Sequence, residues 1–259
     1  MSTQSKGTAC ITGAAQGIGK AIALRLAADG FDIGLNDIPS KQAALEDVKK
    51  EVEGLGRRAA VLSGDVSVEE DVKRMVDEAV KQLGGLDVMV ANAAICKPRA
   101  SVLDISVEEW DATFAINTRG IFLCYKYAAK AMIAQGRGGR IIGATSGAGK
   151  QGYAPLPDYS ASKFAVRGLT QATAQELGKH GITVNTYAPG AVITPMTQQF
   201  PALSGVAEDE FFAGQADLTS TKVNVTPSDI ASLVSFLASK EAGFITGQSI
   251  SADGGRYFD

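Results

Sequence analysis

Short apolar segments with the character of β-strands alternate with helix-like segments along the whole chain of 259 residues. The strand-like segments lie at 9–12, 31–35, 59–62, 86–90, 140–144, 182–185 and 248–252. Between them, apolar residues recur at the spacing of one helix face. Short, continuously apolar strands joined through helices are typical of parallel sheets that are buried on both faces. We therefore expect an α/β fold, a doubly wound parallel sheet of about seven strands with helices on both faces.

Local signals mark the beginnings of three helices. Ser67-Val-Glu-Glu70 and Ser106-Val-Glu-Glu109 have the pattern of a capping box. Thr226 followed by Pro227 predicts a third helix start. The alternation contains no linker or internal repeat, so we expect a single domain over 1–259. The longest irregular stretch, 191–224, contains several Pro and Gly residues and predicts a substrate loop or lid.

Composition excludes several classes of function. The formal net charge is −3 and no basic run occurs, which predicts no nucleic-acid partner. No apolar stretch approaches the roughly 18 residues of a membrane span, and the start of the chain lacks the apolar core of a signal peptide. The odd count of cysteines (Cys10, Cys96, Cys124) favours reduced thiols and a cytoplasmic location. The single histidine, His180, lies in a polar turn, so we expect no metal site.

A glycine-rich turn, Thr12-Gly-Ala-Ala-Gln-Gly-Ile-Gly19, follows the first strand and opens the first helix. Glycine permits a sharp turn and a close approach of the backbone to a ligand. The following helix presents unpaired N–H groups and the positive end of its dipole, which suit a diphosphate. A glycine cluster alone is weak evidence, but its place on the first strand–helix turn predicts a dinucleotide site.

Asp37 ends the second strand-like segment, 18 residues beyond Gly19. A carboxylate at this place binds the hydroxyls of the adenosine ribose and repels a 2′-phosphate. Neither Gln16 nor Ile38 offers the positive charge that a 2′-phosphate needs. We therefore expect NAD(H) in preference to NADP(H), the alternative being that Asp37 is a turn residue before Pro39.

Tyr159 and Lys163 lie four residues apart in a segment with helical character. Residues at this spacing share one face of a helix. A phenol is a weak acid with a usual pKa of about 10, and a neighbouring positive charge lowers that pKa. The pair could thus pass a proton to or from a substrate oxygen. A solvated surface pair has the same spacing, so the pair alone does not decide between the two.

Together these motifs resemble those of the short-chain dehydrogenase/reductase family, which has a Rossmann fold. The resemblance runs from about residue 6 to residue 255 and matches the motifs in order. Its glycine motif is matched by Thr12, Gly13, Gly17 and Gly19, its tyrosine–lysine motif by Tyr159 and Lys163, and its remaining positions by Asp65, Asn92, Ala93, Asn117, Ser146, Pro189, Gly190 and Thr194. In the segment 91–94 the first Asn and the last Gly of the family pattern are both Ala.

The resemblance implies an enzyme that transfers hydride between NAD(H) and a ketone or secondary alcohol. The implied catalytic residues are Asn117, Ser146, Tyr159 and Lys163. Tyr159 would exchange the proton, Lys163 would hold the nicotinamide ribose, Ser146 would bind the substrate oxygen, and Asn117 would hold a water. The implied cofactor-binding residues are Gly13, Gln16, Gly17, Ile18, Gly19, Asp37, Asp65, Val66, Asn92, Ala93, Tyr159, Lys163, Pro189, Gly190, Val192 and Thr194.

Within the family, the segments 159–170, 181–196 and 246–255 are most similar to diacetyl/acetoin reductases, which are also butanediol dehydrogenases. This similarity implies a small diketone, hydroxyketone or vicinal diol as substrate. Those enzymes typically have Gln directly after the catalytic Ser, where this chain has Gly147, and a smaller polar residue in place of Tyr153. A larger or aromatic alcohol or ketone is therefore the alternative. Candidate pocket residues are Gly147, Tyr153, Leu156, Val192, Met196 and Phe200.

Two other classes are open to a chain of this kind. A non-catalytic NAD-binding scaffold would not need Asn117, Ser146, Tyr159 and Lys163 as a set. A nucleotide-sugar epimerase also has Tyr and Lys four apart, but requires a longer chain with a separate substrate domain. No Arg or Lys of the 191–224 segment obviously serves a carboxylate, which favours an uncharged substrate, although Lys97, Arg99 and Lys150 are nearby in sequence. Resemblance implies a homotetramer or homodimer, and the aromatic tail 256–259 suggests a contact between subunits.

Overall fold

A computed structural model describes residues 5–99, 101–201 and 205–258. Within these ranges, seven strands form one parallel sheet in the order β3-β2-β1-β4-β5-β6-β7. The order reverses beside β1, as in other doubly wound folds. The strands are β1 (Thr8–Thr12), β2 (Asp32–Asn36), β3 (Ala59–Val61), β4 (Val88–Ala91), β5 (Gly139–Ala144), β6 (Ile182–Pro189) and β7 (Ser249–Ala252).

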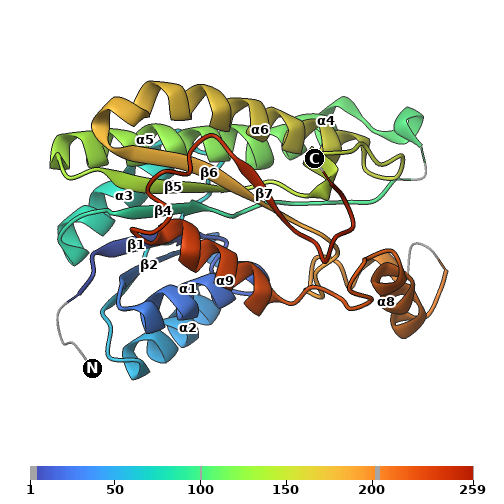
Figure 1. Cartoon of the computed structure of the whole chain (residues 1–259), viewed down its shortest axis with the longest axis horizontal. Coiled ribbons are helices and arrows are strands. Elements are labelled where there is room, and N and C mark those ends of the chain that lie inside the picture. The colour runs from blue at the N-terminus through green and yellow to red at the C-terminus, as the bar shows by residue number, and fades with distance from the viewer. Residues whose placement is uncertain (1–4, 100, 202–204, 259) are drawn as a thin grey trace.

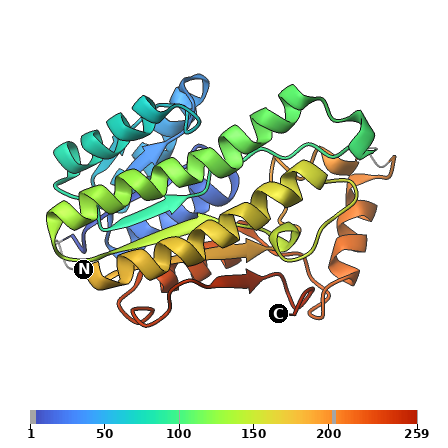
Figure 2. The ribbon, with the colours of Figure 1, turned by 90° about the horizontal axis from the view of Figure 1, so that it is seen from above.

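Helices cover both faces of the sheet, as Figures 1 and 2 show. One face carries α1 (Gly17–Asp29), α2 (Gln42–Gly54) and α9 (Pro227–Ala238), whose apolar side chains pack with those of β1 and β2. The other carries α3 (Glu69–Leu83), α5 (Ile121–Gln135) and α6 (Pro157–Leu177), with α4 (Val107–Phe114) against α6. Successive residues of β1 alternate between the two cores, because strand side chains point to opposite faces. The expected two-sided α/β sheet is confirmed.

Of the three expected helix starts, two are confirmed and one is wrong. Ser106 and Thr226 both form capping boxes. The predicted box at Ser67 is wrong, because α3 begins at Glu69 and no side chain caps it. The Ser67 backbone N–H instead donates to the Asp65 carboxylate at 2.8 Å. The sequence pattern does not show that the Asp65 carboxylate binds the Ser67 backbone N–H.

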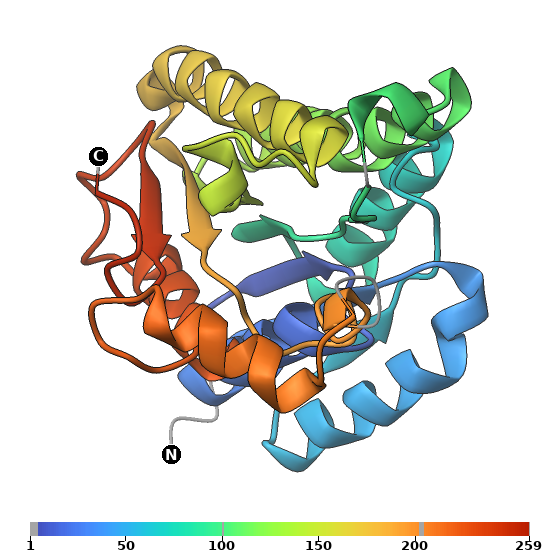
Figure 3. The same ribbon diagram turned by 90° about the vertical axis from the view of Figure 1, so that its right-hand side faces the viewer.

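The segment 191–224 is less irregular than its composition suggests. It contains α8 (Glu208–Asp217), which lies apart from the sheet in Figure 1 and in front of it in Figure 3. A parallel bridge between Val192 and Val225 closes the base of this excursion. Residues 202–204, which belong to the predicted lid, and Asp259 of the tail lie outside the described ranges.

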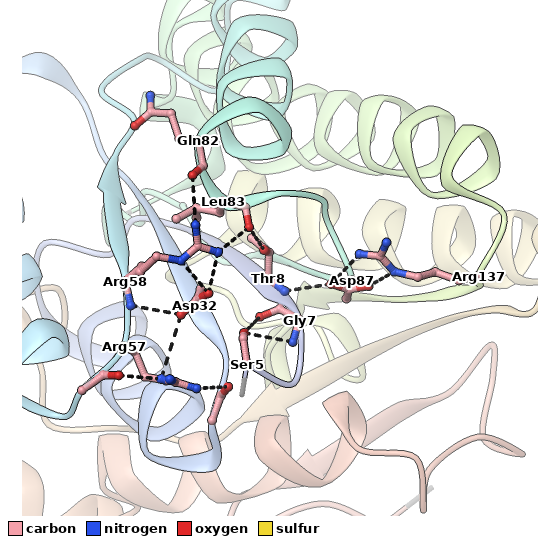
Figure 4. Close-up of polar contacts among 12 residues, drawn as sticks. Ser5, Gly7, Thr8, Asp32, Arg57, Arg58, Gln82, Leu83, Asp87 and Arg137 are labelled. Atoms are coloured by element: carbon pink, nitrogen blue, oxygen red, sulfur yellow. Dashed lines mark hydrogen bonds and ion pairs between the residues drawn. The ribbon is translucent and has the colours of Figure 1, made fainter. Parts of the chain in front are cut away.

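Two carboxylates form hydrogen bonds and ion pairs at the amino ends of the central strands (Figure 4). The Asp32 carboxylate at the start of β2 accepts hydrogen bonds from Arg58 Nε at 3.0 Å and Nη2 at 2.8 Å. Asp87, before β4, accepts from the Thr8 backbone at 2.8 Å and from Arg137 Nε at 2.7 Å. These bonds fix the end of the sheet opposite to the candidate site.

Candidate active site

The glycine turn between β1 and α1 is compact because side chains are missing from it. Gly13 and Gly17 have φ values of 65° and 55°, in the left-handed region that favours glycine. A Cβ on Gly19 would lie 2.0 Å from the Gly13 carbonyl oxygen and 2.7 Å from Asn92 Nδ2. The turn therefore keeps its backbone open at the amino end of α1, as a diphosphate site requires.

Hydrogen bonds tie this turn to two other strands. The Thr12 hydroxyl accepts from the backbone N–H groups of Asn92 and Ala93, each at 3.0 Å. Asn92 Nδ2 donates to the Thr12 carbonyl at 2.8 Å, and Asn92 Oδ1 accepts from the Tyr187 hydroxyl at 2.7 Å. The carboxyl ends of β1, β4 and β6 are thus held together around the glycine turn.

A cavity of about 480 Å³ lies across these strand ends. All sixteen residues expected to bind the cofactor line it. Its floor is the glycine turn, and its far end reaches Ser146, Tyr159 and Lys163. The backbone cradle, the helix amino end and the carboxylate described next fit a dinucleotide. The predicted lining residues are Gly13, Gln16, Gly17, Ile18, Gly19, Asp37, Asp65, Val66, Asn92, Ala93, Tyr159, Lys163, Pro189, Gly190, Val192 and Thr194.

Asp37 follows β2 and lines this cavity. Its carboxylate accepts from the backbone N–H groups of Ile38 at 2.9 Å and Ala15 at 3.2 Å, which fix its position. Lys41 also lines the cavity, and its ammonium donates to Gln16 Oε1 at 3.3 Å. Sequence reasoning considered only Gln16 and Ile38 as sources of positive charge and missed Lys41. A cation four residues beyond Asp37, in the turn after the strand, was the available signal.

Tyr159 and Lys163 share one face of α6, as their spacing predicts. The Lys163 ammonium lies 5.3 Å from the centroid of the Tyr159 ring and donates to the Ala144 carbonyl at 2.9 Å. The Lys163 side chain is buried, with 1% of the residue exposed. Ser146 follows β5 and its hydroxyl accepts from the Ala148 N–H at 3.1 Å. Helix α6 and the end of β5 thus bring the three predicted groups together.

Burial dominates the protonation of this pair. It raises the pKa of Tyr159 above its usual value, Cys96 adds to the rise, and the Ser146 hydroxyl opposes it. Burial lowers the pKa of Lys163 to about 8. The sequence argument, in which a positive charge lowers the pKa of Tyr159, omitted this burial. The phenol therefore holds its proton at neutral pH, and the pKa of the Lys163 ammonium lies closer to neutrality than that of an exposed lysine.

Asn117 occupies a π-helical turn, Ala115–Gly120, between α4 and α5. Such turns occur frequently at functional sites. Its Oδ1 accepts from the Ile95 N–H and its Nδ2 donates to the Ile95 carbonyl, both at 2.8 Å. Asn117 is fully buried and lies behind the cavity wall, whereas Ile95 lines the cavity. The two hydrogen bonds from Asn117 therefore hold Ile95 in that wall.

A second cavity of about 560 Å³ opens beside the first. Ser146 and Tyr159 line both, so the two cavities meet at the predicted catalytic groups. Five of the candidate pocket residues, Gly147, Tyr153, Leu156, Met196 and Phe200, line the second cavity. Val192, predicted for both sites, lines only the first.

Several lining residues of the second cavity were not expected from the sequence. Arg99 follows β4, Phe211 and Gln215 lie on α8, and Arg256 and Tyr257 lie in the tail. Cys96 also lines this cavity, and burial raises the pKa of its thiol to about 12. Of these residues, the sequence noted Arg99 only as near the site, and it singled out the tail for a contact between subunits and not for the cavity wall.

None of the helices among the described residues has the length and apolar character required to cross a membrane. No group of three or more His, Cys, Asp or Glu side chains in that part of the chain could hold a metal ion.

The chain is similar to known oxidoreductases over nearly its whole length. A family model described as enoyl-(acyl carrier protein) reductase matches residues 13–256. The short-chain dehydrogenase/reductase eriH of Hericium erinaceus is 52% identical over 254 residues, which cover 97% of this chain and 98% of eriH. The L-2,3-butanediol dehydrogenase of Corynebacterium glutamicum is 39% identical over 97% of this chain and 98% of its own length. The structure of carveol dehydrogenase from Mycobacterium avium in complex with NAD has a TM-score of 0.91 at 34% identity, covering 99% of both chains.

The fold and the site therefore define an oxidoreductase with a Rossmann-type sheet and a cavity that fits a dinucleotide. The chain belongs to the short-chain dehydrogenase/reductase family.

Proposed function

We propose that this enzyme interconverts ketones and secondary alcohols at the junction of its two cavities, with Tyr159 as the acid–base residue. The observation that carries the proposal is the meeting of the two cavities at Ser146 and Tyr159. The first cavity fits a dinucleotide, which supplies the hydride donor or acceptor when bound. The second cavity is where the carbonyl or carbinol would lie.

The chain's own groups supply the proton chemistry. In reduction, the Tyr159 hydroxyl donates a proton to the substrate oxygen, and the neighbouring Ser146 hydroxyl stabilises the charge that develops there. Lys163 can replace that proton, because burial brings its pKa to about 8. Asn117 would support the relay to solvent by holding a water and by positioning Ile95. Oxidation of an alcohol reverses these steps.

The substrate class is drawn from the relatives and the cavity. The butanediol dehydrogenase similarity supports a small hydroxyketone or vicinal diol. The volume of about 560 Å³ and the aromatic lining of Tyr153, Phe200 and Phe211 favour the alternative, a larger or aromatic ketone. At about 30 Å³ for each water-sized group, the volume of about 560 Å³ holds on the order of twenty heavy atoms, well beyond diacetyl.

A substrate panel tests these assignments. We would follow NADH absorbance with diacetyl, acetoin and aryl ketones, and NAD⁺ reduction with butanediol and aryl carbinols. Turnover that is abolished in Tyr159→Phe supports the proposal. No turnover of any member by the wild-type enzyme, together with retained NADH binding, would instead favour a non-catalytic NAD-binding scaffold.

We also propose that NAD(H) is preferred over NADP(H). The fixed Asp37 carboxylate would repel a 2′-phosphate, whereas Lys41 would attract one. Asp37→Ser should therefore raise kcat/KM with NADPH relative to NADH by at least tenfold. Adding Lys41→Met to that variant should reverse most of the gain. A wild-type enzyme that already prefers NADPH would contradict the assignment of Asp37.

The segment 191–224 is proposed as the cover of the nicotinamide end and of the substrate. Met196 and Thr197 of this segment support this, because they line both cavities. A cytoplasmic location and a homotetramer, or a homodimer, are also proposed. Exposed aromatic side chains on α4, α5 and α6 (Trp110, Phe122 and Phe164) support association of subunits. Light scattering after size exclusion would measure the assembly, and a monomer would contradict it.

A further inference from the structure

Arg256 and Tyr257 of the C-terminal tail line the second cavity. Gly254 and Gly255, with φ of 67° and 74°, turn the chain back after β7. The Asp253 carboxylate, 4% exposed, accepts from the backbone N–H groups of Gly255, Arg256 and Tyr257 at 2.9, 3.2 and 3.1 Å. The tail is therefore fixed at its root by a buried anchor.

The tail is also held from the α8 side. The Thr221 N–H donates to the Gly254 carbonyl at 3.1 Å, and the Ser220 hydroxyl donates to the Gly255 carbonyl at 2.8 Å. These bonds join the tail to the turn after α8. The wall of the cavity thus consists of α8 and the tail together.

Tyr257 fills space that the absent side chain of Gly147 leaves. A Cβ on Gly147 would lie 2.9 Å from the Tyr257 ring and 3.6 Å from the Tyr153 hydroxyl. The hydroxyls of Tyr153 and Tyr257 are hydrogen-bonded to each other, and their rings meet edge to face. The residue directly after Ser146 therefore sets how close the tail comes to the reacting groups.

Arg256 is oriented by neutral partners only. Its Nε donates to the Tyr257 hydroxyl and its Nη1 to Gln215 Oε1, both at 2.6 Å. Its guanidinium carbon lies 5.9 and 5.4 Å from the centroids of the Tyr153 and Tyr257 rings. Within the described ranges, Nη2 has no hydrogen-bond partner and no carboxylate lies within 4.0 Å of this guanidinium. The Arg256 side chain is thus held in place while its Nη2 group can still donate hydrogen bonds to a ligand.

The charge of the cavity wall is one-sided. Its lining contains Arg99 and Arg256 but no Asp or Glu among the described residues. The Arg99 guanidinium forms an ion pair with Glu109 at 2.6 Å. Among the described residues, Arg256 is therefore the one cation of this lining that has no carboxylate partner. A guanidinium beside aromatic and aliphatic surface favours a carboxylate, because the pair forms strong charge-assisted hydrogen bonds.

We propose that Arg256 selects substrates in which an apolar body carries a carboxylate at a distance from the reacting carbon. This inference rests on the proposed function for the place of the substrate, and it replaces the expectation of an uncharged substrate. That expectation looked for cations on the 191–224 segment, whereas Arg256 reaches the cavity from the tail.

The test compares an acid with its own ester. The probes are 4-acetylbenzoate and methyl 4-acetylbenzoate, and calorimetry measures their dissociation constants on enzyme saturated with NAD⁺, where a ketone cannot be reduced. One charge-assisted hydrogen bond is worth about tenfold or more in affinity. We expect the wild-type enzyme to bind the acid at least tenfold more tightly than the ester, and Arg256→Gln to bring the two constants together.

Two further variants separate charge recognition from structure. Lys97→Gln removes a cation from an exposed position between the lining residues Cys96 and Pro98 and should leave the acid-to-ester ratio unchanged. Arg256→Lys keeps a cation and should retain part of the preference. A wild-type ratio near one, failure of the acid to bind, or equal weakening of acid and ester by Arg256→Gln would overturn the inference. Because no turnover is required, failure of the proposed reaction is seen separately in the NADH assay.

Discussion

Replacement of Gly19 by Ala should damage both stability and cofactor binding, although it adds only one methyl group. The new Cβ would meet the Gly13 carbonyl oxygen at 2.0 Å, whereas ordinary contact begins at about 3.4 Å. The contact must therefore open by more than an ångström, and its partner is backbone in the glycine turn. Overpacking of this kind costs about 1–3 kcal/mol, against a gain of about 0.5–1 kcal/mol from replacing Gly within a helix. We expect a net loss of about 1–2 kcal/mol.

The same shift should weaken NADH, because the displaced turn forms the floor of the cofactor cavity. A loss of about 1.4 kcal/mol in binding corresponds to tenfold in the dissociation constant. We therefore expect the NADH dissociation constant of Gly19→Ala to rise by at least tenfold. Fluorescence titration with NADH and urea unfolding measure the two effects on the same preparation.

Gly168→Ala is the matched control for this substitution. Gly168 also lies within a helix, α6, but a Cβ there would have nothing within 4 Å. This variant should gain about 0.5–1 kcal/mol of stability and bind NADH as the wild-type enzyme does. If Gly19→Ala were as stable as Gly168→Ala and bound NADH equally well, the steric argument for the turn would be refuted.

Two other predictions concern the cavity wall and the far end of the sheet. Gly147→Ala should displace the Tyr257 ring and raise KM for aryl ketones several-fold, while the affinity for NADH stays unchanged. The control variant Gly152→Ala, where a Cβ would have nothing within 4 Å, should leave KM unaltered. Asp32→Asn should cost about 1–3 kcal/mol in urea unfolding at pH 7, since it removes charged hydrogen bonds from Arg58. Burial raises the pKa of Asp32, but the Arg58 hydrogen bonds and charge outweigh it, so the folded pKa lies below the usual value. The stabilisation is present above that usual value and is lost as pH falls through the folded pKa. The difference in free energy of unfolding between wild type and variant should therefore shrink below about pH 4. A constant difference from pH 7 to pH 3 would contradict this.

The parts of the fold that follow from local sequence were predicted well. The apolar strands, the glycine turn and the capping boxes at Ser106 and Thr226 each depend on residues close together in the chain. The start of α3 was misplaced because Asp65 took the Ser67 N–H, a competition between neighbours that the pattern does not show. Helix α8 was missed because the Pro and Gly residues around it dominate the composition of its segment.

The cofactor cavity was anticipated more completely than the substrate cavity for a physical reason. Its residues follow successive parallel strands, and the carboxyl ends of such strands must meet at one edge of the sheet. The substrate cavity instead depends on loop and tail segments whose meeting no local rule determines. Arg256 lies in the tail, more than a hundred residues from Tyr153, and the turn at Gly254 and Gly255 brings it back to the cavity.

The central claim is that Tyr159 exchanges the substrate proton beside a separately bound dinucleotide. Its direct test is kcat for NADH-dependent ketone reduction by Tyr159→Phe, with the NADH dissociation constant measured on the same protein. Loss of a general acid costs about 10²–10⁴ in rate, so kcat should fall by at least a hundredfold while NADH binding stays within about twofold. Tyr127→Phe, on α5 and outside both cavities, should retain wild-type kcat. A Tyr159→Phe enzyme with wild-type kcat would contradict the account.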